Sequence, residues 1–227
     1  MGDDKAARML DAAEDLLVRF GYRRTTVDDV ARIAGVGKGT IYLYWPTKSD
    51  LFGTVLVRES ARVLAEQLAV LEADPAEARL HRLMRHTYLQ TMGRPLSRAF
   101  ATRDHEILGE LLTHGESGAR FIAGKVDTTV QYLQVLHRHG LLTDDPATDR
   151  FVFHRLSALV LGTFLLDGMP GMEGLSLEAA ADALATTVRR AFEPAAEPAA
   201  GMVRDAAHEL TNLCKRWARE LDDALPG

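Results

Sequence analysis

The sequence of 227 residues lacks several features that mark whole classes of protein. It has one cysteine, Cys214, so it cannot form the intramolecular disulfide framework of a small secreted domain, and a lone thiol suits a reducing compartment. Its formal net charge is −5, which argues against non-specific coating of nucleic acid or of an anionic membrane. A local basic patch remains compatible with DNA binding.

The chain also lacks a long uninterrupted apolar run. Its most apolar stretch, FVFHRLSALVLGTFLL at residues 151–166, is interrupted by His154 and Arg155 and is shorter than the roughly 20 residues that span a bilayer. The amino-terminal stretch MGDDKAARML is acidic and soon amphipathic, without the apolar core of a signal peptide. We therefore expect a cytoplasmic protein with no membrane partner.

The residue patterns of common enzymes are missing as well. The sequence has no nucleophile elbow and no phosphate-binding loop between a strand and a helix. His81 and His86 are five positions apart and His137 and His139 two, and neither pair shares a helix face well enough to chelate a metal. We expect no enzymatic activity, no cofactor and no bound metal.

Alternation of period two, which is typical of strands, is nowhere sustained. Apolar residues recur three and four positions apart along almost the whole chain, and this spacing predicts an all-α fold. Together with glycine and proline punctuation, the pattern predicts helices at about residues 5–20, 27–34, 38–45, 48–72, 75–92, 96–112, 116–139, 146–167, 177–192 and 201–224. The stretch EPAAEPAAG at 193–201 is too rich in Pro and Ala for packed core and is expected to be a linker.

Positive charge is concentrated near the amino end. Between Arg19 and Lys48 there are six basic and two acidic residues, so this segment carries a charge of +4 within an acidic chain. A basic patch on a negatively charged protein is typical of sequence-specific DNA binding.

The same segment contains a helix start followed by a tight turn. In TTVDD, Thr26 is placed to cap a helix while Asp29 reaches back, which is a capping box. Gly35 then turns the chain, and a second short helix begins within three residues. Two short helices joined in this way make a helix-turn-helix. The buried stripe of the first is expected to be Val27, Val30, Ala31 and Ala34.

The second short helix begins almost without side chains, in the stretch GVGKGTIYLYW. A helix that enters the major groove end-on brings its first turn close to phosphates and base edges, and Gly37 and Gly39 leave room for that approach. Lys38, between them, can reach a guanine edge or a phosphate. A plain helical hairpin with an aromatic core is the alternative, and the order of caps, turn and helices argues against it.

The remaining residues of this helix are expected to divide between two faces. Ile41 and Trp45, four apart, anchor it to the core. Thr47 and Asp50 repeat the capping box for the long helix that follows and leave Lys48 near its positive end, placed for a phosphate. Hydroxyl groups for phosphates, and methyl or ring contacts to thymine, are expected from Thr40, Tyr42 and Tyr44.

The stretch TTVDDVARIAGVGKGTIYLYWPTKSDLF resembles the DNA-binding region of the tetracycline-repressor (TetR) family of bacterial transcriptional regulators, and the resemblance covers roughly the first 55 residues. It implies a three-helix domain that binds a palindromic operator as a homodimer, with Thr26 and Lys48 at phosphates. Two departures stand out: Gly37 replaces a frequent small polar residue, and Trp45 replaces the usual phenylalanine and demands a wider core slot. Groove contacts are implied for Lys38, Gly39, Thr40, Tyr42 and Tyr44.

The resemblance further implies a helical regulatory domain that encloses a small-molecule effector and forms the dimer interface. On this basis we expect a DNA-binding domain at residues 1–47, a ligand-binding and dimerisation domain at 48–193, and a linker with an extra amphipathic helix at 194–227. The implied function is a repressor that is released from its operator by a small, largely apolar or aromatic ligand.

Two helices are candidates for the two-fold interface. Residues 151–166 are apolar nearly all round, so this helix must be covered on both sides. The helix at 177–192 offers a face of small residues that allows close approach, and monomer core is the alternative for both helices. The residues of that face are Ala181, Leu184, Ala185 and Val188.

Ligand contacts are harder to predict, because aromatic and methionine stripes are more often ordinary core. We expect inward-facing side chains on several helices of the regulatory domain. The candidates are Met84, Tyr88, Met92, Phe100, His105, Phe121, Tyr132, His154 and Phe164.

The last helix lies outside the usual family plan and has an apolar stripe made of Val203, Ala206, Leu210, Leu213, Trp217 and Leu221. The stripe shows that the helix packs on something: its own subunit, a dimer partner or another protein. The alternative function is therefore a DNA-binding regulator without a small ligand, controlled by a protein partner through this helix.

Overall fold

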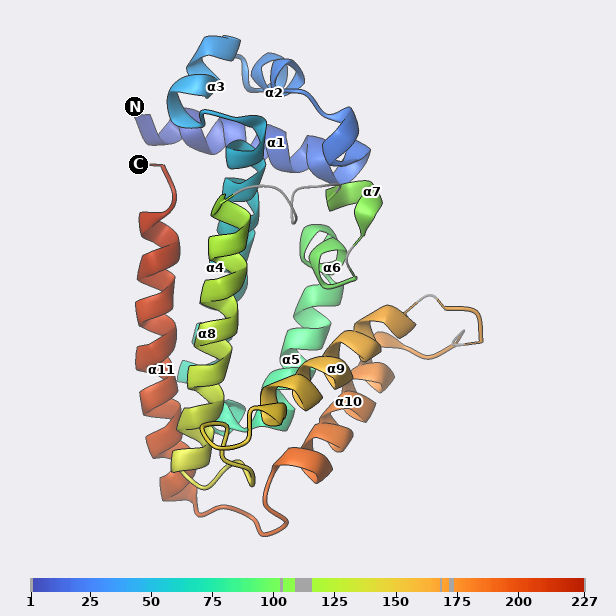
Figure 1. The fold of residues 1–227 in the computed structure, drawn as a ribbon, viewed down its shortest axis with the longest axis vertical. Helices are drawn as coiled ribbons and strands as arrows, with labels where there is room; N and C mark the ends of the chain where they lie inside the picture. The colour runs from blue at the N-terminus through green and yellow to red at the C-terminus, as the bar shows by residue number, and fades with distance from the viewer. Residues whose placement is uncertain (1, 103, 109–115, 168, 172–173, 227) are drawn as a thin grey trace. The chain divides into compact units, whose positions relative to one another are not determined.

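The computed structural model describes residues 2–102, 104–108, 116–167, 169–171 and 174–226, and all regular elements within them are helices (Figure 1). None of the described helices combines the length and the apolarity needed to cross a bilayer. The elements are α1 Gly2–Arg24, α2 Val27–Ala34, α3 Lys38–Tyr44, α4 Lys48–Ala73, η1 Pro75–Ala78, α5 Leu80–Met92, α6 Pro95–Thr102, α7 His105–Leu108, α8 Glu116–Arg138, α9 Phe151–Leu166, α10 Leu177–Phe192 and α11 Ala200–Asp223.

The all-α prediction is confirmed, and the ends of α2 and α10 fall where the sequence pattern put them. The helix predicted over 75–92 is broken at Arg79, whose extended backbone (φ −65°, ψ 133°) separates η1 from α5. The helix predicted from residue 146 begins only at Phe151. There the carboxylates of Asp145 and Asp149 accept hydrogen bonds from the backbone amides two residues ahead, and such local bonds compete with helix formation.

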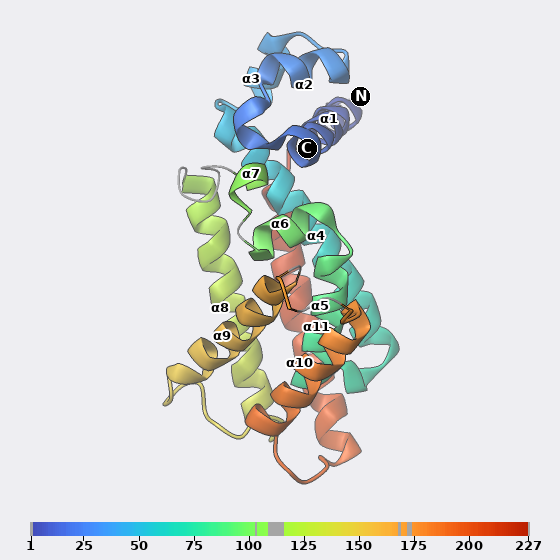
Figure 2. The ribbon, with the colours of Figure 1, turned by 90° about the vertical axis from the view of Figure 1, so that its right-hand side faces the viewer.

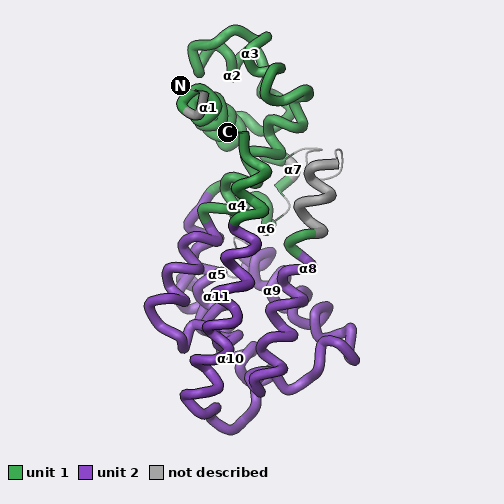
Figure 3. The backbone as a smooth tube through the Cα atoms, turned by 90° about the vertical axis from the view of Figure 1, so that its left-hand side faces the viewer, with its two compact units in different colours: residues 1–62, 95–125, 219–227 green, residues 63–94, 126–218 purple. Residues whose placement is uncertain are grey.

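The chain forms two compact units, each assembled from separate stretches of sequence (Figure 3). Unit 1 comprises residues 1–62, 95–125 and 219–227, and unit 2 comprises residues 63–94 and 126–218. Helices α4, α8 and α11 have residues in both units. The domain limits expected at 47 and 193 stay predictions.

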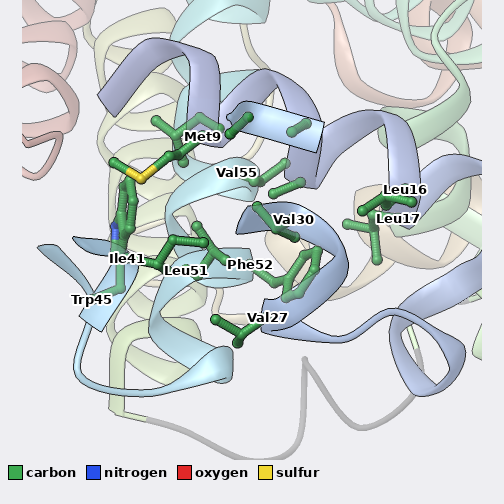
Figure 4. Close-up of a cluster of buried hydrophobic side chains, with 14 of the residues drawn as sticks. Met9, Leu16, Leu17, Val27, Val30, Ile41, Trp45, Leu51, Phe52 and Val55 are labelled. Carbon is green, nitrogen blue, oxygen red and sulfur yellow. The ribbon is translucent and has the colours of Figure 1, made fainter. Parts of the chain in front are cut away.

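The core of unit 1 joins the first four helices, as the side chains in Figure 4 show. Met9, Val30, Ile41 and Phe52 are each at most 1% exposed, and burying one such side chain contributes about 1.5–3 kcal/mol. The same cluster includes residues of α6 and α7, so these two helices are part of the packing around the helix-turn-helix. They contribute Leu96, Ala99 and Leu108.

Helix α1 bends at Gly21, where the backbone has φ +75°, and resumes up to Arg24 instead of closing there. A Cβ atom at this position would lie 2.0 Å from the carbonyl oxygen of Glu106 in α7. Glycine is therefore required twice over, for its left-handed backbone and for the close approach of α7. Across the same unit, Arg58 of α4 binds Asp11 and Glu14 of α1 at 2.8 and 2.6 Å.

Unit 2 is built on the pairing of α5 and α10 (Figure 2). The face of α10 predicted for a two-fold interface is buried instead within the subunit, with Ala181 and Val188 fully covered. This part of the interface prediction is wrong, because the small side chains serve close packing inside one chain. The buried residues of this face are Ala181, Leu184, Ala185 and Val188.

Helix α11 packs on its own subunit, the first of the three alternatives left open by its apolar stripe. Within unit 2, Glu209 of α11 binds His139 at 2.9 Å as well as Arg138, and Lys215 binds Glu72 of α4 at 2.7 Å. Its apolar stripe is buried, including Leu210 at 0% exposure, except for Trp217, which is half-buried.

Candidate DNA-binding site

The predicted capping box at the start of α2 is confirmed. The Thr26 hydroxyl accepts a hydrogen bond from the backbone amide of Asp29 at 3.2 Å and donates one to the Asp29 carboxylate at 2.6 Å. Hydrogen bonds from Thr26 and then from Arg32 hold the pKa of Asp29 below its ordinary value. At the other end, Gly35 adopts the left-handed conformation (φ 67°, ψ 37°) that the turn into α3 requires.

The amino end of α3 is open to its surroundings. No side chain caps the helix at Gly37, and a Cβ atom at Gly39 would meet no heavy atom within 4 Å. Internal packing thus gives no reason for a glycine at position 39. The N–H of Thr40 donates to the carbonyl of Gly37 at 2.9 Å. The N–H groups before it lie at a helix end, where backbone donors lack intrahelical partners and favour an anion or a polar base edge.

The two sides of α3 differ as the sequence predicts. Ile41 and Trp45 are 1% and 3% exposed, and the indole N–H of Trp45 donates to the hydroxyl of Thr54 at 2.9 Å. That hydrogen bond lets the core accommodate tryptophan in place of the phenylalanine usual in the resembling family. Lys38, Gly39 and Tyr42 are exposed, whereas Thr40 and Tyr44 are half-buried.

Leu43 was missed by sequence reasoning. Its side chain is 85% exposed, the highest value among the exposed large apolar residues of the described chain. The signal was present, because position 43 lies midway between the buried positions 41 and 45 and therefore on the opposite side of the helix. A leucine held in water at this place is suited to contact a thymine methyl group.

Lys38 and Lys48 both have partners within the protein. The ammonium of Lys38 lies 2.7 Å from a carboxylate oxygen of Asp28 in α2, and this hydrogen bond and charge raise the pKa of Lys38. The ammonium of Lys48 donates to the carbonyl of Tyr22 at 2.6 Å and lies 4.2 Å from the centre of the Tyr22 ring. Burial lowers the pKa of Lys48. The second capping box, between Thr47 and Asp50, is confirmed.

The residues predicted for a ligand pocket are only partly brought together. Tyr88 of α5 stacks on Phe164 of α9 with ring centres 5.2 Å apart, and Met92 is buried nearby along α5. Met84 and Tyr132 are half-buried in unit 2, and burial raises the pKa of Tyr132. The side chains of His105 and Phe121 lie outside the described residues.

Two of these predictions are not met by the packing. His154 is exposed on α9, because Val152 and Leu156 occupy the covered side of that helix. The prediction that it faces inward is wrong. Phe100 packs against the core of unit 1, whereas Tyr88 and Phe164 belong to unit 2.

A family model described as bacterial regulatory proteins, tetR family, matches residues 9–55. Over 87 residues the chain is 37% identical to the HTH-type transcriptional regulator YhgD of Bacillus subtilis, a stretch that covers 37% of this chain and 44% of that protein. The matched part thus spans less than half of the relative's length.

Two solved structures share the fold. NalD, the secondary repressor of the MexAB-OprM multidrug efflux pump in Pseudomonas aeruginosa, is 22% identical, with a TM-score of 0.62 over 86% of this chain and 100% of that one. A protein of Saccharomonospora viridis, described as a transcriptional regulator and solved in complex with choline, is 22% identical, with a TM-score of 0.51 over 83% and 97%.

These findings agree with the capped helix, the left-handed glycine and the open helix end described above. Residues 9–55 therefore resemble the tetR family of bacterial regulatory proteins, and the chain as a whole shares the helical fold of solved regulators such as NalD.

Proposed function

We propose that the protein is a transcriptional regulator that binds an inverted-repeat DNA operator as a homodimer and represses the gene beside it. One observation carries this proposal: α3 presents an exposed face with a side-chain-poor first turn, while Ile41 and Trp45 fix its other side in the core. That arrangement suits a helix whose amino end enters the major groove. The repressor NalD, which has the same fold, is consistent with this role.

The proposed DNA contacts fall into two groups. Groove contacts are assigned to Lys38, Gly39 and Tyr42, with Leu43 added from its exposure. Thr40 and Tyr44, half-buried, contribute hydroxyl groups at the edge of this face. Phosphate contacts are assigned to Thr26 and to Lys48, which must turn away from Tyr22 to make one.

The proposed homodimer uses the outer faces of α9 and α10, which packing inside the subunit leaves uncovered. On α9 the side chains of Leu161, Leu165 and Leu166 are 37%, 52% and 45% exposed. On α10 the exposed hydroxyl groups of Thr186 and Thr187 donate to the backbone carbonyls four residues earlier. Burying this face in an interface would therefore leave these two donors with their hydrogen bonds. Apolar leucines beside small side chains suit a close, self-complementary contact.

A small effector is proposed to bind among the side chains that line the interior of unit 2. Tyr88, Met84 and Met92 lie one helical turn apart on α5, and the Tyr88–Phe164 stack offers a flat aromatic surface. This lining favours a flat or apolar ligand held by few polar groups. The structure with choline bound, which shares the fold, shows a small molecule in one such protein.

The alternative, control by a protein partner through the last helix, is not favoured by the packing of the described residues, since the apolar stripe of α11 is covered within its own subunit except for the half-buried Trp217. The operator-binding proposal is tested by selecting duplexes from a random pool with purified protein and measuring binding by fluorescence anisotropy. We expect an enriched inverted repeat whose half-sites are centred about 34–36 Å apart. Equal affinity for the selected and a scrambled duplex would refute the proposal.

A further inference from the structure

The carboxylate that holds Lys38 comes from an acid that the helix cap does not need. Asp28 and Asp29 are adjacent in the first turn of α2, and Asp29 alone makes the capping box with Thr26. The side chain of Asp28 extends instead toward α3, where its oxygen lies 2.7 Å from the ammonium of Lys38. Asp28 therefore has a partner on the proposed DNA-binding helix and does not take part in the capping box of its own helix.

This ion pair determines the charge that α3 presents. The helix reads KGTIYLY, so Lys38 is its single charged side chain. The side chains of Lys38 and Asp28 are 50% and 65% exposed, so the pair lies at the surface where DNA is proposed to bind. Glycines on both sides of Lys38 leave the space around its stem open.

The ion pair with Asp28 affects two kinds of contact differently: the hydrogen bonds of Lys38 to base edges and its attraction to phosphates. An ammonium has three N–H donors, so it can keep Asp28 and still donate to the O6 or N7 acceptor of a guanine. A phosphate is attracted less strongly to the paired Lys38, because its repulsion from the neighbouring carboxylate cancels most of its attraction to the ammonium. Non-specific binding depends almost wholly on such phosphate contacts.

We propose that Asp28 is a specificity-determining residue, which holds Lys38 for a guanine edge and suppresses its binding to phosphates on unrelated DNA. This inference rests on the proposed function. It assigns a role to an acidic residue in a basic segment, where repulsion from DNA would otherwise be a disadvantage.

The test compares Asp28→Asn with the wild type on the duplex selected above and on a scrambled duplex of equal length. Releasing Lys38 should tighten scrambled-duplex binding about two- to fivefold for each subunit, the range expected for an exposed ion pair, with a smaller change on the selected duplex. The slope of log affinity against log salt on the scrambled duplex should steepen by about 0.9 for each phosphate gained per subunit.

The matched control is Asp15→Asn in α1, which removes the same charge from an exposed ion pair, with Arg19 at 2.8 Å. If Asp28→Asn and Asp15→Asn change the two affinities equally, the effect is general electrostatics and the inference is wrong. It is also wrong if Asp28→Asn has its full effect in a Lys38→Ala background, since Asp28 is argued to act through Lys38. A wild-type protein that does not distinguish the two duplexes would instead overturn the proposed function itself.

Discussion

Among single residues of the first three helices, some serve the fold and others serve the proposed DNA binding. Gly21 and Gly35 have positive φ values and serve the fold, whereas Gly39 lies in a regular helix with open space around it. Similarly, Ile41 is buried and Leu43 is exposed, although both are apolar and two positions apart. Exposed residues such as Gly39 and Leu43 allow the proposed DNA contacts to be tested by substitution, because changing them leaves the core untouched.

Gly39→Ala should have opposite effects on stability and on DNA binding. Alanine is favoured over glycine inside a helix by about 0.5–1 kcal/mol, and the new methyl group meets nothing within the protein. The melting temperature should therefore stay the same or rise. The methyl group should keep the first turn away from the groove and lower operator affinity at least about tenfold. Thermal unfolding with anisotropy measures both, and unchanged affinity would remove Gly39 from the site.

Leu43→Ala tests the contact that its exposure suggests. Because the side chain is 85% exposed, stability should change by less than about 0.5 kcal/mol. Affinity for the selected duplex should fall about fivefold or more, and preference at one thymine-containing position should relax. Ile33→Ala in α2, also exposed at 47%, is the control for loss of a surface apolar group. Equal effects of the two changes would count against a base contact by Leu43.

Contacts between elements hold α5, α10 and the linker together around one buried carboxylate. Glu193, 6% exposed, accepts hydrogen bonds from the backbone amide and the ring of His81, both at 2.8 Å, and binds Arg79 at 3.1 Å. Burial alone would raise the pKa of Glu193, but the hydrogen bonds from His81 and the charges beside it lower that pKa below the ordinary value of 4.5. The cluster also explains the break before α5, because extended backbone at Arg79 brings its guanidinium to this site.

Glu193→Gln should therefore remove an acid-sensitive part of the stability. A carboxyl whose pKa is lowered by folding stabilises the protein fully above its unfolded pKa of about 4.5, and this stabilisation is lost as the pH falls through the lower folded value. Urea unfolding of the wild type at pH 7 and below pH 4 should show that loss, and the variant should show less of it. Glu178→Gln, exposed on the same helix, is the control. An identical pH dependence in the wild type and Glu193→Gln would exclude this role.

Spacing and caps were enough to predict elements whose determinants are local in sequence. The helix α2, with Thr26 before it and Gly35 after it, is the best example. The break at Arg79 was not predictable, because it depends on a carboxylate 114 positions away. The outward position of His154 likewise depends on which side of α9 the rest of unit 2 covers. Of the site, the buried and exposed sides of α3 followed from period 3.6, whereas the Asp28–Lys38 pair required the turn geometry.

To act as proposed, two copies of the molecule must bring their α3 helices to adjacent grooves, so the proposed function depends on association as well as on the fold. The buried side chains of α10 pack inside the subunit, whereas the exposed leucines of α9 offer an apolar surface for the proposed partner. An apolar surface of this kind at the outer side of a packed helix is unfavourable in water unless it is covered.

Leu165→Glu should weaken the homodimer while leaving each subunit folded. The side chain is 52% exposed, so a carboxylate is tolerated in the monomer but is costly in a dry two-fold contact, where it would face its own copy. Sedimentation should show a dimer for the wild type and a monomer for the variant at micromolar concentration, with operator affinity reduced at least about tenfold. Leu43→Ala serves as a control that should remain dimeric. A monomeric wild type would contradict the proposed assembly.

The discontinuous make-up of the two units has a consequence for biosynthesis. Residues 219–226 belong to unit 1, including Leu221 at 5% exposure, although the helix-turn-helix of that unit lies far earlier in the chain. Neither unit can therefore acquire all of its contacts while the ribosome is still translating residues before 219. A chain cut short before residue 219 would lack part of both units, so such truncated copies are expected to be poor competitors for the proposed operator and good substrates for proteases.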